Sequence, residues 1–478
     1  MTLGGSYWKA VTLSLSRKWQ NSLTVLVPVV ERRALSTTIH DRVINGQIEV
    51  TCQPGLEDVL STELKALGLD PGKLSKNGKR GRLILQSKQI TDTDLFRCCL
   101  YLGSAANIRW KCTSFSARGL AELRRKTAKV DWTEYIKMPM LTEDSGHNPM
   151  SGIDVRVSAT KSKLYHSEAV RERILLGISD SFGNTDLESK SLIGRLKDSE
   201  ENPEPSNTCT LLLTAKIERD QVDIFVNAYP TPLHQRGYRL QTGKAPLRED
   251  LAYAMLFSAG WIPAWIKNGS TEGRSKYPGL LDPFCGSGTI IIEGLGMALG
   301  LLPGRLRASP FQNTTIDNPD LWKSLQTNSV AASKPSRVRV SASDRDAGAV
   351  KATEDNAKRA NVWKFLDGHL HHVSLSGQPW FLKDLRQCPS SVLVVTNPPF
   401  GNRISRKSHL LPLHQKLGHS MQQLVERHQR TVRGVILTDD PIFLSKVGHG
   451  SRMQSKTLLS MSHGGGKVFA IDWAPKSK

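Results

Sequence analysis

The chain lacks several features that define whole classes of protein. Its 478 residues include seven cysteines, and no two of them form a Cys-x-x-Cys pair. This pattern argues against a disulfide scaffold or a cysteine-based zinc site and fits a reducing compartment. The longest early apolar run, residues 23–30, is far too short to cross a membrane. We therefore expect no metal site and no membrane partner.

Acidic residues are missing from the first thirty positions, which contain Lys9, Arg17 and Lys18 and are rich in Ser, Thr, Leu and Trp. This composition resembles an organellar transit peptide, and the alternative is a disordered basic tail. We predict that residues 1–45 form a transit peptide for the mitochondrion, with the plastid as the alternative.

Basic residues exceed acidic ones along the rest of the chain as well. The net charge is +21, and residues 1–45 carry six basic and two acidic residues, which leaves +17 for the remainder. An excess of this size predicts a polyanionic partner. The length allows two or three domains with substantial cores.

A glycine-rich string follows the short apolar run 278–282. The strand, glycine turn and helix expected over 278–299 resemble the opening unit of a doubly wound α/β domain. No Gly-Lys-Ser/Thr follows, which excludes a phosphate loop, and Ile291 replaces the third glycine of the dinucleotide fingerprint. We predict that this turn holds the amino-acid tail of a nucleoside cofactor, although an ordinary strand-to-helix turn is the alternative. The string is Asp282, Pro283, Phe284, Cys285, Gly286, Ser287, Gly288 and Thr289.

A second expected strand, residues 336–344, ends on Asp344 and precedes a helix over 347–359. A carboxylate at this position can accept hydrogen bonds from both ribose hydroxyls of the cofactor. Asp346 is the weaker candidate, and either residue could instead cap the helix. Asp367 is the candidate for the cofactor's adenine amine.

A third expected strand, residues 392–396, is almost entirely apolar, as in a central parallel strand. It delivers the string Asn397, Pro398, Pro399 and Phe400 to its carboxyl end, where open sheets bind ligands.

These residue types suit methylation of an exocyclic amine on a nucleobase, which is a poor nucleophile. The Asn397 side-chain oxygen and the Pro398 carbonyl can accept its two N–H bonds, while Phe400 stacks on the base. The prolines fix the direction of the carbonyl. A sulfonium methyl donor is already electrophilic, so positioning suffices and no metal is needed. Together the two strings indicate methyl transfer from S-adenosylmethionine.

The first half of the chain reads as mixed α and β structure. Apolar periodicity predicts helices over 56–67 and 169–178, and the polar segment 188–207 predicts a loop or insertion. Alternating or apolar runs predict strands over 48–52, 81–85, 153–157 and 221–227.

Basic and aromatic residues are interspersed in the segment 234–248, which lies between the first half of the chain and the glycine-rich string. Arginine can contact phosphate and tyrosine can stack on a base, so this segment is a candidate RNA contact. A solvated linker is the equal alternative. The candidates are His234, Arg236, Tyr238, Arg239, Lys244 and Arg248.

Several strings together resemble the THUMP-domain RNA guanine-N2 methyltransferases, notably the bacterial 23S ribosomal RNA enzymes and relatives acting on transfer RNA. The resemblance runs from about residue 48 to 471. Besides the two strings above, it rests on residues 51–57, 232–239, 245–249 and 464–467.

The resemblance implies an α/β fold, with a Rossmann-like class I methyltransferase domain over 229–478. An α+β part precedes it: a ferredoxin-like region over 46–110 and a THUMP RNA-binding domain over 111–228. It implies that residues 282–289, Asp344 and Asn397 serve S-adenosylmethionine, and that 397–400 hold the base. The chain departs from the family around Asp367. A second, fused methylation activity is not expected.

The leading interpretation is guanine-N2 methylation of structured RNA, with ribosomal RNA favoured over transfer RNA. The chemistry of the Asn397 site does not distinguish one amine from another, so N6-adenine methylation of RNA or DNA is an alternative. A third is an RNA-binding assembly factor with an inactive methyltransferase fold.

Overall fold

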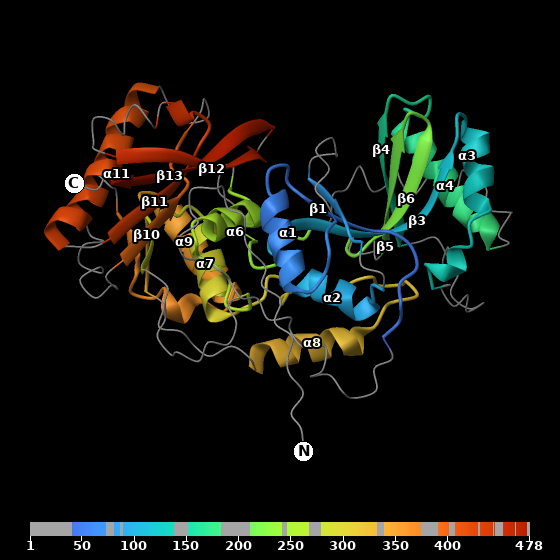
Figure 1. Cartoon of the computed structure of the whole chain (residues 1–478), viewed down its shortest axis with the longest axis horizontal. Helices are drawn as coiled ribbons and strands as arrows, with labels where there is room; N and C mark the ends of the chain where they lie inside the picture. Colours follow the sequence, from blue (N-terminus) through green and yellow to red (C-terminus); the bar gives the residue numbers. More distant parts are fainter. Residues whose placement is uncertain are drawn as a thin grey trace, which may run out of the picture.

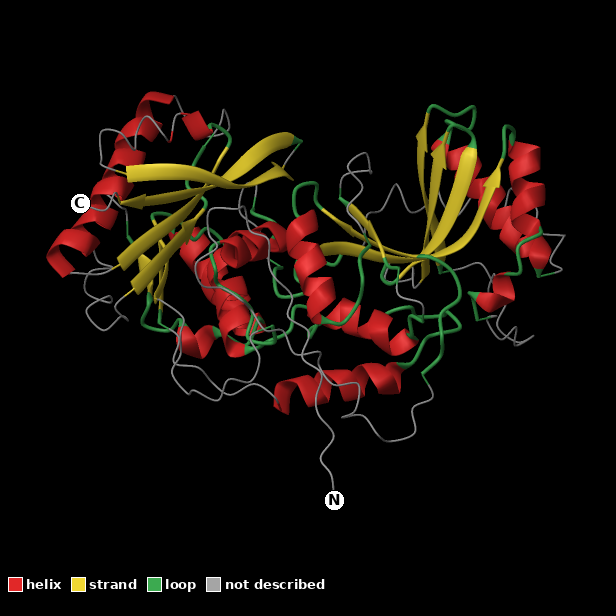
Figure 2. Ribbon diagram, viewed as in Figure 1, coloured by secondary structure: helices red, strands yellow, loops and turns green. Residues whose placement is uncertain are grey.

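The structure is a computed structural model with two sheets in two lobes (Figures 1 and 2). Residues 1–40 of the predicted transit peptide, Lys244 and the segment 188–207 lie outside the described residues. The same holds for Gly464 of the string 464–467. The structure describes residues 41–72, 81–86, 89–137, 152–182, 211–240, 246–266, 279–331, 339–373, 391–400, 407–428, 431–442, 444, 453–463 and 465–475.

The C-terminal lobe contains a seven-stranded sheet in the order β12-β13-β11-β10-β7-β8-β9. Its strands are β7 (Gly279–Asp282), β8 (Val340–Asp344), β9 (Leu370–His372), β10 (Ser391–Thr396), β11 (Thr431–Thr438), β12 (Met453–His463) and β13 (Gly466–Pro475). The strands β7 to β11 are parallel, whereas β13 is antiparallel to both β11 and β12. Strand order reverses at β7, which lies between β8 and β10, so the ligand-binding switch point is at the carboxyl end of β7.

Apolar side chains project from both faces of this sheet, as in a buried parallel sheet. Leu280 joins the core cluster that includes α6 (Glu249–Ser258) and α7 (Thr289–Leu299). Its neighbour Leu281 joins the opposite cluster, with residues of α11 (Lys407–His428). Helices therefore cover both faces, and the predicted Rossmann-like fold is confirmed.

The N-terminal lobe has a six-stranded sheet in the order β2-β1-β3-β6-β5-β4. Its strands are β1 (Ile48–Cys52), β2 (Arg82–Ile84), β3 (Ala105–Ser116), β4 (Ile153–Thr160), β5 (Leu211–Glu218) and β6 (Gln221–Asn227). Its helices are α1 (Glu57–Ala66), α2 (Asp92–Tyr101), α3 (Leu120–Ala128) and α4 (Ser167–Ser181). Later in the chain, α8 (Pro319–Ala331) contacts α2, whereas α9 (Ala347–Arg359) packs against β8 and β9 of the C-terminal sheet. In Figure 1, α1 and α2 lie beside the β1 end of the sheet and α3 and α4 beside the β4 end.

Short 3-10 turns complete the described elements at Trp132–Glu134 and Trp363–Phe365. Most expected elements appear close to their predicted bounds; the expected helix over 347–359 is α9, and the expected strand over 221–227 is β6.

Two expected boundaries differ from the structure. β3 runs without interruption through the boundary between residues 110 and 111, pairing with β1 at one end and β6 at the other. The regions before and after this boundary therefore share one sheet. The last residues of the predicted transit peptide, 41–45, also overlap the folded lobe, because Val43 forms a β-bridge with Thr91 and Ile44 is buried. Residues 41–45 thus pack on the folded lobe.

Candidate active site

Asp282 lies at the end of β7 and is buried. Its Oδ1 atom accepts hydrogen bonds from the Thr396 hydroxyl at 2.6 Å and from the Phe284 amide at 3.2 Å. Its buried Oδ2 atom has no hydrogen-bond partner among the described residues. Burial raises the pKa of Asp282 to about 7, and the Thr396 bond opposes this shift. At the carboxyl end of β7, where open sheets bind ligands, this unpartnered oxygen can accept a hydrogen bond from a ligand.

The glycine loop after Asp282 needs its glycines. Gly286 and Gly288 have φ values of +54° and +84°, which residues other than glycine rarely adopt. A Cβ on Gly288 would lie 2.7 Å from the methyl carbon of Thr353. Gly288 is also the residue at which α7 begins, so the first amides of α7, including that of Thr289, face the loop.

The rest of the loop is held by β8. The Cys285 amide donates to the Ser343 carbonyl at 2.9 Å, and the Ser343 hydroxyl donates to the Pro283 carbonyl at 3.3 Å. The Cys285 thiol is buried, and burial raises its pKa well above the ordinary value, so it stays protonated. Cys285 is thus a buried residue whose amide holds the loop to β8.

Asp344, at the end of β8, faces the glycine loop. One carboxylate oxygen accepts from the Gly286 amide at 3.0 Å and the other from the Asp346 amide at 3.0 Å. Each oxygen retains a second lone pair for a ligand hydroxyl. Asp346 is the residue that caps α9, through the Gly348 amide at 2.8 Å. The structure thus separates the two acids that the sequence left as alternatives.

Asn397 follows β10 directly and is half-buried. Its side-chain oxygen is buried and has no hydrogen-bond partner among the described residues. Pro398 is buried, Pro399 is half-buried, and Phe400 packs against the main hydrophobic core. Because Thr396 bonds to Asp282, the ends of β10 and β7 are joined. The Asn397 string and the glycine loop therefore occupy the same edge of the sheet.

Two residues of α9 that sequence reasoning missed hold the loop from the other side. The Thr353 hydroxyl donates to the Gly286 carbonyl at 2.7 Å. The buried Asn356 amide donates to the Ser287 carbonyl at 2.9 Å. Their spacing of three residues places both on one helix face, and this spacing was the available signal.

Asp367 does not reach this edge. It is exposed and precedes β9, which runs parallel to β8 with Leu370 opposite Ala342 and His372 opposite Asp344. A residue before Leu370 therefore lies toward the amino end of the sheet, whereas the loop and Asp344 lie at the carboxyl end. The predicted adenine contact of Asp367 is not supported by this geometry.

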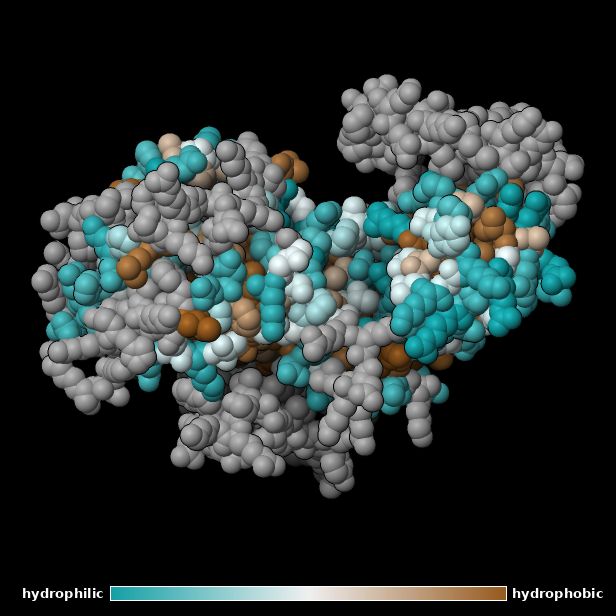
Figure 3. All heavy atoms as spheres, turned by 90° about the horizontal axis from the view of Figure 1, so that it is seen from above, coloured by the Kyte–Doolittle hydropathy of each residue, from teal (hydrophilic) through white to brown (hydrophobic). Residues whose placement is uncertain are grey.

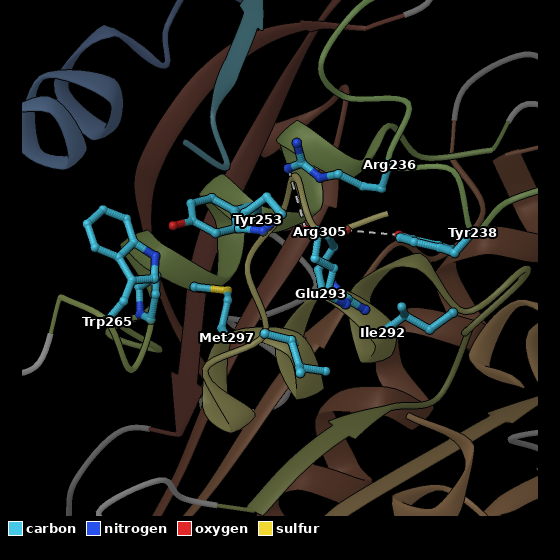
Figure 4. Close-up of a pocket in the computed structure, with 12 residues that line it drawn as sticks. Arg236, Tyr238, Tyr253, Trp265, Ile292, Glu293, Met297 and Arg305 are labelled. Carbon is cyan, nitrogen blue, oxygen red and sulfur yellow. Dashed lines mark hydrogen bonds and ion pairs between the residues drawn. The ribbon is translucent and has the colours of Figure 1, made fainter. Parts of the chain in front are cut away.

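Arg236 and Tyr238 were predicted to contact RNA, but both are buried, with 2% and 1% of their surfaces exposed. Arg236 donates to the Leu233 carbonyl at 2.8 Å and lies 3.5 Å from a Glu293 oxygen. The Tyr238 hydroxyl donates to the other Glu293 oxygen at 3.0 Å. Figure 4 shows this group around a cavity of about 10 Å³, which holds no more than about one water. Arg236 also donates to the Gly103 carbonyl of the N-terminal lobe, so the two side chains face the protein interior, which does not favour the predicted RNA contact.

Three further residues of this connector, Arg239, Arg248 and His234, also have partners within the protein. Arg239 bonds to Glu249 at 2.8 Å, and Arg248 bonds to Asp250 at 2.7 Å and contacts His234 at 3.1 Å. Burial lowers the pKa of His234 to about 4, so its ring is neutral at pH 7. These contacts favour a structural connector over the predicted RNA surface.

Within the described stretches, no group of three His, Cys, Asp or Glu residues is arranged to hold a metal ion. No helix in the same stretches is both long and apolar enough to span a membrane.

Comparison with known proteins agrees with this arrangement. Residues 236–468 match the family model described as the RMKL-like methyltransferase domain. The ribosomal RNA large subunit methyltransferase K/L of Legionella pneumophila (strain Lens) is 28% identical over 406 residues, covering 85% of this chain and 50% of the relative. The Marinomonas protein of the same name is 26% identical, covering 82% and 48%. The chain thus spans about half the length of the curated relatives it matches.

Among solved structures, SMU.472, a methyltransferase in complex with SAH, superposes with a TM-score of 0.65 at 20% identity, covering 91% of this chain and 98% of that chain. At this identity the likeness concerns the fold alone.

Proposed function

Residues 236–468 match the family model of the RMKL-like methyltransferase domain, and from this premise we propose that the chain transfers a methyl group from S-adenosylmethionine to an exocyclic amine of RNA. The observation that carries the proposal is the buried, unpartnered side-chain oxygen of Asn397 at the edge that also holds the glycine loop.

The residues of the loop suit each part of the cofactor, which supplies an electrophilic methyl group on a sulfonium. The unpartnered Asp282 oxygen and the amides around Gly286 and Gly288 suit the charged amino-acid tail. Asp344 has lone pairs left for the ribose hydroxyls. Because the sulfonium is already electrophilic, the methyl donor needs no further charged group of the protein to activate it.

The Asn397 string acts on the acceptor base. Its side-chain oxygen and the Pro398 carbonyl accept the two amine N–H bonds, which directs the nitrogen lone pair toward the methyl group. Phe400 offers an aromatic face to the base. A base inside a duplex cannot reach this edge, so the target nucleotide is unpaired or flipped out. Catalysis then rests on positioning rather than on a strong acid or base.

For the substrate, we propose the N2 amine of a guanosine in ribosomal RNA. Support comes from the strings shared with the THUMP-domain family, from the net charge of +21 and from the names of the curated relatives. Transfer RNA guanine and N6-adenine are the outcomes that would replace it.

The test is nucleoside mass spectrometry of RNA incubated with the protein and labelled S-adenosylmethionine. We expect label in N2-methylguanosine from ribosomal RNA. We expect Asn397→Ala to lose about 100-fold or more in turnover, as when one preorganised polar group of an active site is removed. Cofactor binding by calorimetry should survive in this variant. Label in N6-methyladenosine would overturn the substrate, and full activity of Asn397→Ala would remove Asn397 from the mechanism.

We also propose that the N-terminal segment, whose first thirty residues contain no acid, directs import into an organelle. A fluorescent fusion of residues 1–40 should reach the mitochondrion. A fusion that stays in the cytosol would refute this.

A further inference from the structure

The N-terminal sheet buries a carboxylate on its polar face. Glu49 of β1 is completely buried and lies opposite Arg109 on β3 and Ile84 on β2. The alternate residues of β1, Ile48 and Val50, belong to the apolar core on the other face of the sheet. Glu49 therefore points away from that core and toward the polar face.

Three cations converge on this one carboxylate. Arg82 Nε contacts one Glu49 oxygen, while Arg109 Nη1 at 3.3 Å and Lys216 Nζ contact the other. They come from three strands, β2, β3 and β5, and their side chains are 15–26% exposed. Three positive charges against one negative charge leave an excess of two at a partly buried place.

The neighbouring groups do not cancel this excess. Lys111 is paired with Asp223 at 2.8 Å, which makes a neutral pair beside the cluster. Arg156, an exposed residue of β4, adds positive charge that acts on Arg109. Burial lowers the pKa values of Arg109 and Lys216, while Glu49 raises them. Glu49 thus favours the charged forms of Arg109 and Lys216, which burial disfavours.

The cluster is also preformed. The Lys216 ammonium lies 5.2 Å from the centre of the buried Phe225 ring, which supports it from below. A group of fixed, partly exposed cations is suited to a phosphate, which guanidinium groups bind through paired N–H bonds.

We propose that Arg82, Arg109 and Lys216, organised by Glu49, bind a backbone phosphate of the RNA at a distance from the methylation site. Figure 3 shows hydrophilic side chains mixed with neutral and some hydrophobic ones over the middle of the molecule on the side seen from above. This inference rests on the proposed RNA function. It assigns the positioning of the RNA to the sheet of the N-terminal lobe, whereas the arginines of the connector serve the protein interior.

The test measures binding of a labelled RNA oligonucleotide that contains no guanosine, at a series of salt concentrations. Lys216→Gln should weaken binding several-fold and reduce the salt slope by about 0.7, the value for one lost contact on a single strand. Two cations still neutralise Glu49 in this variant, so we expect it to fold. Arg124→Gln is the matched control, because this substitution also removes one positive charge. Arg124 pairs with Asp180 in the helical layer, away from the cluster. We expect it to retain the wild-type slope.

Glu49→Gln separates RNA binding from a purely structural network. Removing the competing carboxylate should tighten RNA binding while lowering the unfolding temperature, and inorganic phosphate should raise that temperature more than in the wild type. If Lys216→Gln keeps the wild-type slope, or if folded Glu49→Gln binds RNA no more tightly, the cluster is structural and the proposal fails. If Glu49→Gln does not fold, the Lys216→Gln slope decides.

Methylation is assayed separately on guanosine-containing RNA. A wild type that binds RNA through the cluster but methylates no guanosine would refute the proposed function alone. A wild type that methylates guanosine with no dependence on the cluster would refute this inference alone.

Discussion

The carboxyl edge of the C-terminal sheet and the connector between the lobes look equally functional in the sequence. In the part of the chain that the structure describes, polar oxygens at the sheet edge lack partners, whereas the charged groups of the connector are paired. At the sheet edge, buried oxygens of Asp282 and Asn397 lack partners among the described residues. In the connector, Arg236 faces Glu293, Arg239 faces Glu249 and Arg248 faces Asp250.

The difference shows how to distinguish a ligand site from a structural network of the same composition. Charged groups that pair inside the protein contribute to the fold, whereas unpartnered oxygens at the carboxyl edge of a parallel sheet lie where such sheets bind ligands. Arg236 Nε in the connector also lacks a hydrogen-bond partner among the described residues, so position in the fold separates the two regions as much as the missing partner does. A count of basic and aromatic residues cannot make this distinction.

The largest expected effect tests the connector. Arg236→Ala leaves Glu293 buried without its cation, so the free energy of unfolding should fall by about 3–5 kcal/mol, the usual cost of breaking a buried ion pair. Urea unfolding measures this loss. The double variant Arg236→Ala with Glu293→Gln should recover part of it, since no unpaired charge remains. A stable Arg236→Ala protein that has lost RNA affinity would restore Arg236 as an RNA contact.

Asp344→Ala should weaken S-adenosylmethionine binding by about 1.5–3 kcal/mol, the contribution of hydrogen bonds to a charged group. Isothermal calorimetry measures the dissociation constant. Asp346→Ala is the matched control, because Asp346 caps α9 and should affect stability more than affinity. Equal dissociation constants for Asp344→Ala and the wild type would make Asp344 a structural acceptor for the Gly286 amide.

Asn356→Ala leaves the Ser287 carbonyl without its donor, so the glycine loop should bind S-adenosylmethionine more weakly by about 0.5–1.5 kcal/mol. Gln326 lies on α8, and its side-chain amide donates a comparable hydrogen bond to the Arg305 carbonyl at 3.0 Å, which Gln326→Ala removes. It should change stability without changing cofactor affinity. The same loss of affinity in both variants would mean that Asn356 acts only through global stability.

The last expected effect concerns pH. The pKa of Asp282 rises from 3.8 to about 7 because of burial, so between about pH 4 and pH 7 the folded protein holds a proton that the unfolded chain has lost. The stability of the ligand-free wild type should therefore fall relative to Asp282→Asn as the pH rises through this window. Thermal unfolding at pH 5, 6, 7 and 8 measures the difference. Parallel curves would show that Asp282 is ionised throughout.

Much of the site was predictable because its signals are local. The strand, glycine turn and helix from β7 to α7 occur within about twenty consecutive residues, and apolar runs and glycines specify them directly. The same is true of β10 and the Asn397 string. Thr353 and Asn356 were missed because their partners are 67 and 69 residues away in the chain.

The sequence by itself determined the elements of the methyltransferase lobe, the residues of its loop and the basic character of the chain. Periodicity and turn chemistry encode these features over short distances. Only the tertiary structure decided that β3 joins the two N-terminal regions in one sheet, that Asp367 lies toward the wrong end of β9, and that Arg236 is buried. Burial and charge pairing depend on segments far apart in the chain, so they exist only once the chain has folded.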